Sequence, residues 1–290
     1  MRLTQTGSLK IIFSILLFCN SSAKSQMPGD LLSGKESYFK FAIDYLSNAV
    51  YYGRKDSFAL PYITPAISYH DKSGLYIEGS LSYLAGTGSQ VDAGSLTAGY
   101  EFSSLNEKIS GDVYASKFFV NNSSYSVRGE VNAATGGSLY YNTGPLTLNS
   151  GLDVSFSSKT DIALNFGLSH LFEFGDGHWS LTPSAIVNAG TQNFYQNYLT
   201  NRKYSLKRKR RIIQNSGTIK VIVINKSFSV LDYELSVPLN YASHKWGLFF
   251  TPTFSIPEST IKYSLNNGAT YRTENLSNTF YVEIGGYIKF

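Results

Sequence analysis

Apolar and polar residues alternate one by one through most of this chain, which is the period of a β-strand with two different faces. One segment shows the pattern clearly: Leu146, Leu148, Leu152, Val154 and Phe156 alternate with Thr147, Asn149, Asp153 and Ser155. The same alternation predicts twelve strands, at residues 43–54, 57–70, 73–86, 90–103, 106–120, 124–141, 144–157, 159–173, 177–191, 227–241, 244–255 and 277–290. The chain is therefore predicted to be all-β.

The composition of the polar face indicates which way the apolar face points. A soluble β-sandwich also alternates, with its apolar face turned inward. Here the polar face carries Ser, Thr, Gly, Asn, Tyr and acidic residues rather than the long charged side chains of a solvated surface, which suits a confined, hydrated interior. We therefore predict an antiparallel transmembrane β-barrel of about twelve strands. Aromatic residues gather near strand ends, where interfacial girdles are expected: Tyr100, Phe102, Phe172, Phe174, Trp179 and Trp246.

The last segment gives a more specific signal. Its apolar face runs through Phe280, Val282, Ile284 and Ile288 and reaches the terminal Phe290. A closing strand of about ten alternating residues that ends on phenylalanine resembles the last strand of bacterial outer-membrane β-barrel proteins. The resemblance covers residues 43–290. It implies that Phe290 belongs to a signal read by the outer-membrane assembly machinery, and it implies nothing about cargo.

Composition and the N-terminal segment agree with export and a membrane barrel. Aromatic residues make up 15% of the 290 residues and charged residues only 16%, against about 25% charged in soluble domains. Arg2 and Lys10, an apolar run and a small-residue site at 21–23 resemble a secretory signal peptide over residues 1–23. Its removal takes away the single cysteine, Cys19, so disulfide and thiolate chemistry are not expected. The apolar run of the signal peptide is too short for a membrane-spanning helix. Residues 24–42 are predicted to form a periplasmic segment that precedes the barrel.

The connections between the predicted strands differ in length at the two ends. Tight turns follow even-numbered strands, whereas the long segments 192–226 and 256–276 follow odd-numbered ones, as expected of periplasmic turns and external loops. Proline cannot donate to a strand ladder, so the prolines within the predicted strands count against these strands, and some of them are expected at bulges or bends. These prolines are Pro61, Pro65, Pro183, Pro238 and Pro252.

The external segment 192–226 carries nine cationic residues and no acid, although the whole chain has a net charge of only +5. The rest of the mature chain is therefore acidic. The basic run would attract phosphate or carboxylate groups such as those of lipopolysaccharide, or it is simply a solvated loop. Nucleic acid is not expected as a partner. The anion-binding candidates are Arg202, Lys203, Lys207, Arg208, Lys209, Arg210 and Arg211.

The polar face of the predicted strands contains more acidic than basic residues. A water-filled passage with this lining would favour cations or neutral solutes. Alternatively, the charged groups pair with one another and with tyrosine hydroxyls, and so fill a narrow barrel. The lumen-lining candidates are Glu78, Glu101, Asp112, Arg128, Glu130, Asp153, Glu173, Asp232, Glu234, Glu283 and Lys289.

Catalytic and metal sites are not evident in the sequence. The histidines, His70, His170, His178 and His244, lie toward the predicted periplasmic ends of their strands, and no motif of lipid-modifying barrels surrounds them. Ser169 and His170 point to opposite faces and cannot form a nucleophile and base pair. The alternative of a metal site at His170 and His178 rests only on their position across one turn. We expect no enzymatic activity, metal or cofactor.

The expected function is a narrow, porin-like channel or uptake barrel for small solutes in the outer membrane of a Gram-negative cell envelope. The first alternative is a non-conducting structural or surface-binding barrel that acts through its basic loop. The second is a lipid-modifying enzyme. The expected partners are outer-membrane lipid, lipopolysaccharide, the assembly machinery and small solutes.

Overall fold

The computed structural model describes residues 36–56, 58–86, 89–122, 124–199, 221–224, 228–265, 272–273 and 276–290, with backbone only at 221–224, 263–265 and 272. Strands dominate it. They are β1 Tyr38–Leu46, β2 Tyr62–His70, β3 Leu75–Leu84, β4 Gln90–Ser103, β5 Ile109–Val120, β6 Ala133–Asn142, β7 Thr147–Phe156, β8 Thr160–Ser169, β9 Phe172–Phe174, β10 Trp179–Leu181, β11 Ser184–Gly190, β12 Val221–Ile224, β13 Ser229–Ser236, β14 Leu239–Ala242, β15 Trp246–Pro257, β16 Lys262–Leu265, β17 Arg272–Thr273 and β18 Thr279–Lys289. The 3-10 helix η1 spans Val127–Glu130, and the α-helix α1 spans Asn193–Asn197.

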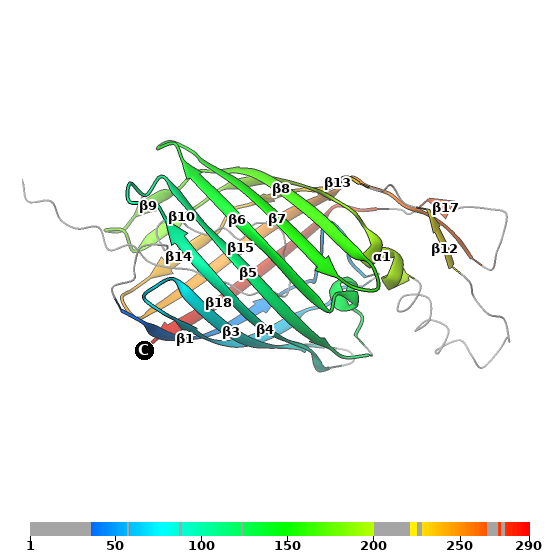
Figure 1. Ribbon diagram of the computed structural model, residues 1–290, viewed down its shortest axis with the longest axis horizontal. Coiled ribbons are helices and arrows are strands. Elements are labelled where there is room, and N and C mark those ends of the chain that lie inside the picture. Colours follow the sequence, from blue (N-terminus) through cyan, green and yellow to red (C-terminus); the bar gives the residue numbers. More distant parts are fainter. Residues whose placement is uncertain are drawn as a thin grey trace, which may run out of the picture.

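The strands form one closed antiparallel barrel, as predicted (Figure 1). Consecutive strands pair from β1 to β8. Three strands of the barrel are each interrupted once: β8 and β9 together form one barrel strand, β10 and β11 form another, and β13 and β14 form a third. β18 pairs with β15 on one side and with β1 on the other, which closes a barrel of 12 strands. Closure leaves no barrel strand with an unpaired edge.

The apolar face of each strand points outward. In β7 the outer Leu148 and Leu152 are exposed, whereas the inner Thr147 and Ser155 are buried. In β18 the outer Phe280, Ile284 and Ile288 are exposed in the same way. An outer band of large apolar side chains is stable only in contact with lipid, since in water it would be a very large exposed apolar surface.

The two ends of the barrel differ. The short-turn end carries the connections 71–74, 104–108, 143–146, 175–178 and 243–245, and the C-terminus lies there (Figure 1). The long-loop end carries the extended connections 47–61, 121–132, 191–228 and 258–278, together with two short ones. At the short-turn end, hydrogen bonds from Ser73 and Ser37 lower the pKa of Asp71 to about 2. The turn after β2 is therefore held by an ionised carboxylate.

Two of the five prolines mark interruptions of the ladder, as expected, whereas Pro65 and Pro252 lie within β2 and β15. Pro183 separates β10 from β11, and Pro238 separates β13 from β14. These two breaks lie opposite one another, because the Thr182 N–H donates to the Pro238 carbonyl at 2.9 Å. Three neighbouring strands are thus interrupted at one level of the wall, where the ladder partners lost to proline are replaced by bonds across the break.

Some predicted boundaries were wrong. The first strand is Tyr38–Leu46 rather than 43–54, so the barrel begins five residues earlier than expected. The chain leaves the extended conformation after Leu46, and Tyr52 and Gly53 have φ of 49° and 72°. The predicted strand 124–141 is also too long, because η1 occupies its first part and β6 begins at Ala133.

Outside the barrel, β12, β16 and β17 form a separate three-stranded antiparallel sheet beyond the long-loop end (Figure 1). The apolar strand β12 pairs with β16, which follows β15 in the chain. Among the described residues, no helix is long and apolar enough to cross a membrane.

Candidate functional site: the barrel interior and its aromatic plug

The connection between β1 and β2 crosses the interior of the barrel at the long-loop end. Tyr51 lies in this connection, and its hydroxyl is 3.3 Å from Ser155 Oγ on β7, on the other side of the barrel. Gly53 lies close to β13 and β15, where an added Cβ would be 2.9 Å from the Cβ atoms of Asp232 and Pro257. The connection therefore spans the opening rather than projecting from it.

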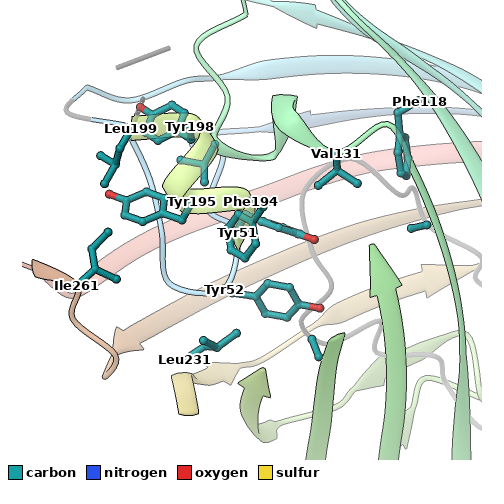
Figure 2. Packing of buried hydrophobic residues seen from close by; sticks show 13 residues of the cluster. Tyr51, Tyr52, Phe118, Val131, Phe194, Tyr195, Tyr198, Leu199, Leu231 and Ile261 are labelled. Atoms are coloured by element: carbon teal, nitrogen blue, oxygen red, sulfur yellow. The ribbon is translucent and has the colours of Figure 1, made fainter. Parts of the chain in front are cut away.

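Aromatic side chains pack around this crossing segment (Figure 2). We call the group the aromatic plug. The Tyr51 ring lies 4.6 Å from the Tyr52 ring and 4.8 Å from that of Phe194, between ring centroids. All the members are buried, and they come from the β1–β2 connection, β5 and the segment after β11. The members are Tyr51, Tyr52, Phe118, Phe194, Tyr195 and Tyr198.

Arg54 ties three connections together beneath the plug. Its guanidinium donates to Gln192 Oε1 at 2.5 Å and to the carbonyl of Ser259, and it lies 4.8 Å from the centre of the Tyr195 ring. The Gln192 amide also donates to Ser259 Oγ at 2.6 Å. Arg54 is only 1% exposed. Because hydrogen bonds to a buried charge are among the strong ones, this network fixes the plug.

Helix α1 is attached to the barrel wall by Asp161 of β8. The carboxylate accepts the backbone N–H groups of Asn193 and Phe194, both at 2.7 Å, and the Thr191 hydroxyl at 2.6 Å. It thus satisfies N–H groups that have no partner within the helix. The attachment holds Phe194 and Tyr195 inside the barrel.

We expect Asp161→Ala to release α1 from the wall. The loss of a capping acceptor costs about 1–2 kcal/mol, so hydrogen exchange at residues 193–199 should accelerate by roughly tenfold, while exchange in β8 itself stays slow. Asp161→Asn keeps one acceptor oxygen, so its exchange rate at residues 193–199 should fall between those of wild type and Asp161→Ala. Unchanged protection of α1 in Asp161→Ala would contradict this role.

The β5–β6 connection also folds inward. Asp92 on β4 accepts hydrogen bonds from Tyr62 at 2.5 Å and from Ser124 at 2.6 Å, which anchors the start of this connection. Farther along it, the Arg128 guanidinium lies 4.5 Å from the centre of the Phe118 ring and 5.4 Å from that of Tyr51. Burial raises the pKa of Tyr51, although Arg128 partly opposes the shift.

Most of the predicted lumen-lining residues face the interior. Asp112, Asp232, Glu234 and Glu78 are buried on inner faces, and Glu101, Asp153, Glu283 and Lys289 are partly buried there. Two candidates, Arg128 and Glu130, lie not on a strand but in η1, in the β5–β6 connection that folds inward at the long-loop end. Glu173 shares the inner face of β9 with its partner Ser180 but is exposed beside the short-turn end. The prediction omitted four buried acids: Asp44, Asp56, Asp92 and Asp161.

Several of these acids are held by neighbouring polar groups. Asp232 accepts the Asn188 amide and the Ser255 hydroxyl, both at 2.9 Å. Tyr114 donates to Asp153 across the inner wall. The interior is therefore an organised polar surface, in which hydrogen bonds orient individual carboxylates.

The basic external segment is only partly described. Arg202, Lys203, Lys207, Arg208, Lys209, Arg210 and Arg211 lie outside the described residues. The beginning of the segment differs from the expectation of an external loop, because residues 192–199 enter the barrel and carry α1. Three of the aromatic residues there, Phe194, Tyr195 and Tyr198, belong to the plug, since their apolar area is buried by packing against the β1–β2 connection.

The histidines divide into separate environments. His178 Nδ1 is 2.9 Å from the Ala242 carbonyl, and His170 Nδ1 bonds to that of Pro145. In the described part of the chain, no three His, Cys, Asp or Glu side chains are arranged to hold a metal ion.

His70 instead joins a polar chain on the inner wall. Its Nε2 is 3.1 Å from Ser68 Oγ, and its Nδ1 is 3.9 Å from Glu101 Oε2. Sequence reasoning missed this group. The i, i+2 spacing of Ser68 and His70 places them on one face and could have indicated the pair, but Glu101 required the register of β2, β3 and β4.

Comparisons with known proteins give structural neighbours only. No protein-family model matches the chain, and no curated protein sequence matches it. The KdgM porin is 11% identical with a TM-score of 0.46, and the match covers 87% of this chain and 99% of that one. LpxR from Salmonella typhimurium is 10% identical with a TM-score of 0.42, and the match covers 86% and 99%. The translocator domain of the autotransporter NalP from Neisseria meningitidis is 11% identical with a TM-score of 0.39, and the match covers 89% and 90%.

Proposed function

We propose that this protein is a porin-like channel for small solutes in the outer membrane, gated at its long-loop end by the aromatic plug. The observation that carries the proposal is the inner face of the barrel, which is lined with hydroxyl groups and oriented carboxylates through the whole closed wall. An interior of this kind is hydrated and favours cations or neutral polar solutes.

The plug supports gating rather than a permanently open pore. Tyr51 reaches the opposite wall, and the Arg54 network joins three connections. Passage past this end therefore requires α1 or the β1–β2 connection to move. The same packing favours a second candidate, a non-conducting barrel whose plug is permanent and whose basic external segment binds anionic groups such as those of lipopolysaccharide.

The membrane orientation belongs to the same proposal. The short-turn end faces the periplasm and the long-loop end faces the outside of the cell, as the lengths of the connections favour. The signal peptide at residues 1–23 is removed on export, and β18 with Phe290 is read by the assembly machinery. The outer band of apolar residues contacts lipid.

Single-channel recording in planar bilayers tests the proposal. Wild-type protein, first shown to be folded by heat-modifiable migration on gels, should give brief cation-selective openings. If the folded protein shows no conductance, and none appears after the plug is loosened, the channel is rejected and the non-conducting barrel is favoured. In that case, loss of lipopolysaccharide binding on replacing Lys207, Arg208, Lys209, Arg210 and Arg211 by glutamine would support the second candidate.

Cation selectivity should depend on inner carboxylates near the β1–β18 seam. Asp44 and Glu283 face the interior from adjacent strands. We expect Asp44→Asn with Glu283→Gln to lower the cation-to-anion permeability ratio several-fold at alkaline pH, where both buried and mutually repelling acids are ionised. The ratio is measured from the reversal potential in a salt gradient, and it should fall because removing negative charge from the interior weakens its preference for cations. The matched control is Asp176→Asn, which neutralises an acid in the exposed turn 175–178; an equal effect of the control would contradict the assignment.

A bulky side chain in the interior would be another way to test for conductance, but Gly285→Trp is not a suitable substitution for that purpose. A Cβ at Gly285 would lie 2.5 Å from the Ile43 carbonyl oxygen and 2.6 Å from Phe249 Cζ. A large side chain there would distort the seam itself, so neutralising substitutions are the better probe.

A further inference from the structure

Three residues near the short-turn end have the arrangement of a nucleophile, a base and an orienting carboxylate. Ser68 Oγ is 3.1 Å from His70 Nε2, and the other ring nitrogen, Nδ1, is 3.9 Å from Glu101 Oε2. Serine hydroxyls become nucleophiles when a histidine within hydrogen-bond reach can take their proton, and a carboxylate on the far side of the ring orients it. The second distance exceeds that of a hydrogen bond, which is common before substrate binds.

The fold fixes this arrangement. Ser68 and His70 are two residues apart on β2 and therefore share its inner face. Their exposed fractions are only 3% and 4%. The imidazole stacks between two tyrosine rings, with centroids 4.9 Å from Tyr38 and 5.5 Å from Tyr76 and interplanar angles of 7° and 17°. A ring packed on both faces cannot turn its nitrogens away from their partners.

Glycine brings the carboxylate into place. Tyr76 pairs with Gly99 of β4, and a Cβ at Gly99 would lie 2.5 Å from Tyr76 Cζ. Because that side chain is absent, the Tyr76 ring leans over β4, and Glu101, two residues farther along the same face, stands beside His70. Lys40 lies directly opposite Ser68 in the β1–β2 register and is buried on the same inner face.

We propose that Ser68, His70 and Glu101 form a hydrolytic site that cleaves water-soluble esters entering the barrel from its short-turn end. The group faces the interior and is separated by the wall from surrounding lipid, so bilayer lipid is not its substrate. This activity goes beyond solute passage and does not depend on the plug.

The reaction balances without a cofactor. Ser68 Oγ attacks the ester carbonyl carbon while His70 Nε2 takes the hydroxyl proton. The bond from that carbon to the alcohol oxygen then breaks, and the alcohol leaves with the proton from His70. Water adds to the acyl carbon and gives a proton to His70, which returns it to Ser68 as the carboxylic acid departs. Ser68 and His70 are the catalytic residues, Glu101 is a positioning residue, and Lys40 is placed to stabilise charge on the carbonyl oxygen.

The test uses the mature, folded barrel in detergent with p-nitrophenyl acetate as substrate and a fluorophosphonate as covalent probe. We expect saturable hydrolysis and a phosphonate adduct that peptide mass spectrometry assigns to Ser68. Ser68→Ala and His70→Gln should each lower kcat at least 100-fold, and Ser68→Ala should abolish the adduct. The matched control is Ser80→Ala on β3, an inner-face serine whose hydroxyl lies 2.7 Å from that of Ser95.

Glu101 requires a separate readout. Glu101→Gln should lower kcat at least tenfold with little change in KM, and Glu101→Asp should recover part of it, because a structural defect would not be rescued by the shorter acid. The proposal is overturned if folded wild type hydrolyses the ester no faster than Ser68→Ala, or if the adduct forms elsewhere. Conductance is measured independently, so failure here leaves the channel proposal intact.

Discussion

Replacing Arg54 by alanine is expected to open the channel. The side chain donates to Gln192 and to the Ser259 carbonyl and lies over the Tyr195 ring. Hydrogen bonds to a charged group contribute about 1.5–3 kcal/mol, and a desolvated contact between a cation and an aromatic ring contributes up to about 2 kcal/mol. If about half of this free energy stabilises the plug in its closed position, Arg54→Ala removes about 2–3 kcal/mol of that stabilisation. The open fraction should rise by roughly 100-fold, because every 1.4 kcal/mol is tenfold.

The measurement is the open probability in planar bilayers for wild type, Arg54→Ala and Arg54→Lys. Lysine keeps the charge but not the planar set of donors, so the open probability of Arg54→Lys should lie between those of wild type and Arg54→Ala. Lys55→Ala is the matched control, since it removes the neighbouring cation, which lies outside the plug. If hydrogen exchange shows that α1 has loosened in Arg54→Ala and the conductance still equals that of wild type, the plug is not the gate.

Arginine at Leu152 is expected to destabilise the barrel strongly. Leu152 lies near the middle of β7, on the outer face, and its side chain is 46% exposed. A cationic side chain at the bilayer midplane costs about 2–4 kcal/mol in a barrel of this kind and close to zero near the interfaces. The free energy of unfolding in lipid vesicles, from urea titration, should fall by about that amount.

Leu146→Arg provides the matched control. Leu146 is an exposed outer leucine that precedes β7 at the short-turn end, so its substitution should cost no more than about 1 kcal/mol. Equal costs at the two positions would mean that the outer face of β7 does not cross a bilayer. That result would also remove the basis for placing the protein in the outer membrane.

The wall of the barrel could be predicted from the sequence because its signal is local. Side chains such as Leu148 and Thr147 differ in polarity at neighbouring positions, and one face must meet lipid while the other does not. The pattern is repeated in every strand, so the number of strands and the direction of the faces follow from it. The interruptions at Pro183 and Pro238 were also expected, since proline removes a donor whatever the surrounding fold.

The plug could not be predicted in this way. Tyr51 and Tyr52 look like strand residues, because tyrosine favours strands and the preceding segment alternates. Their inward turn depends on partners far away in the chain, namely Ser155 and the Phe194 ring. The same holds for the group at His70: its serine partner is two residues away, but Glu101 is placed by a register through three strands.

The pairing of β1 with β18 also constrains how the molecule is built. Residue 40 meets residue 289 across this seam, so the contact that completes the wall joins almost the most distant parts of the chain. Such contacts bear the largest loop-closure entropy and form slowly. Until they form, β1 and β15 each present a row of unsatisfied backbone groups, which hydrocarbon does not tolerate. Folding and membrane insertion are therefore one coupled event for this chain, timed by the arrival of its last eleven-residue strand.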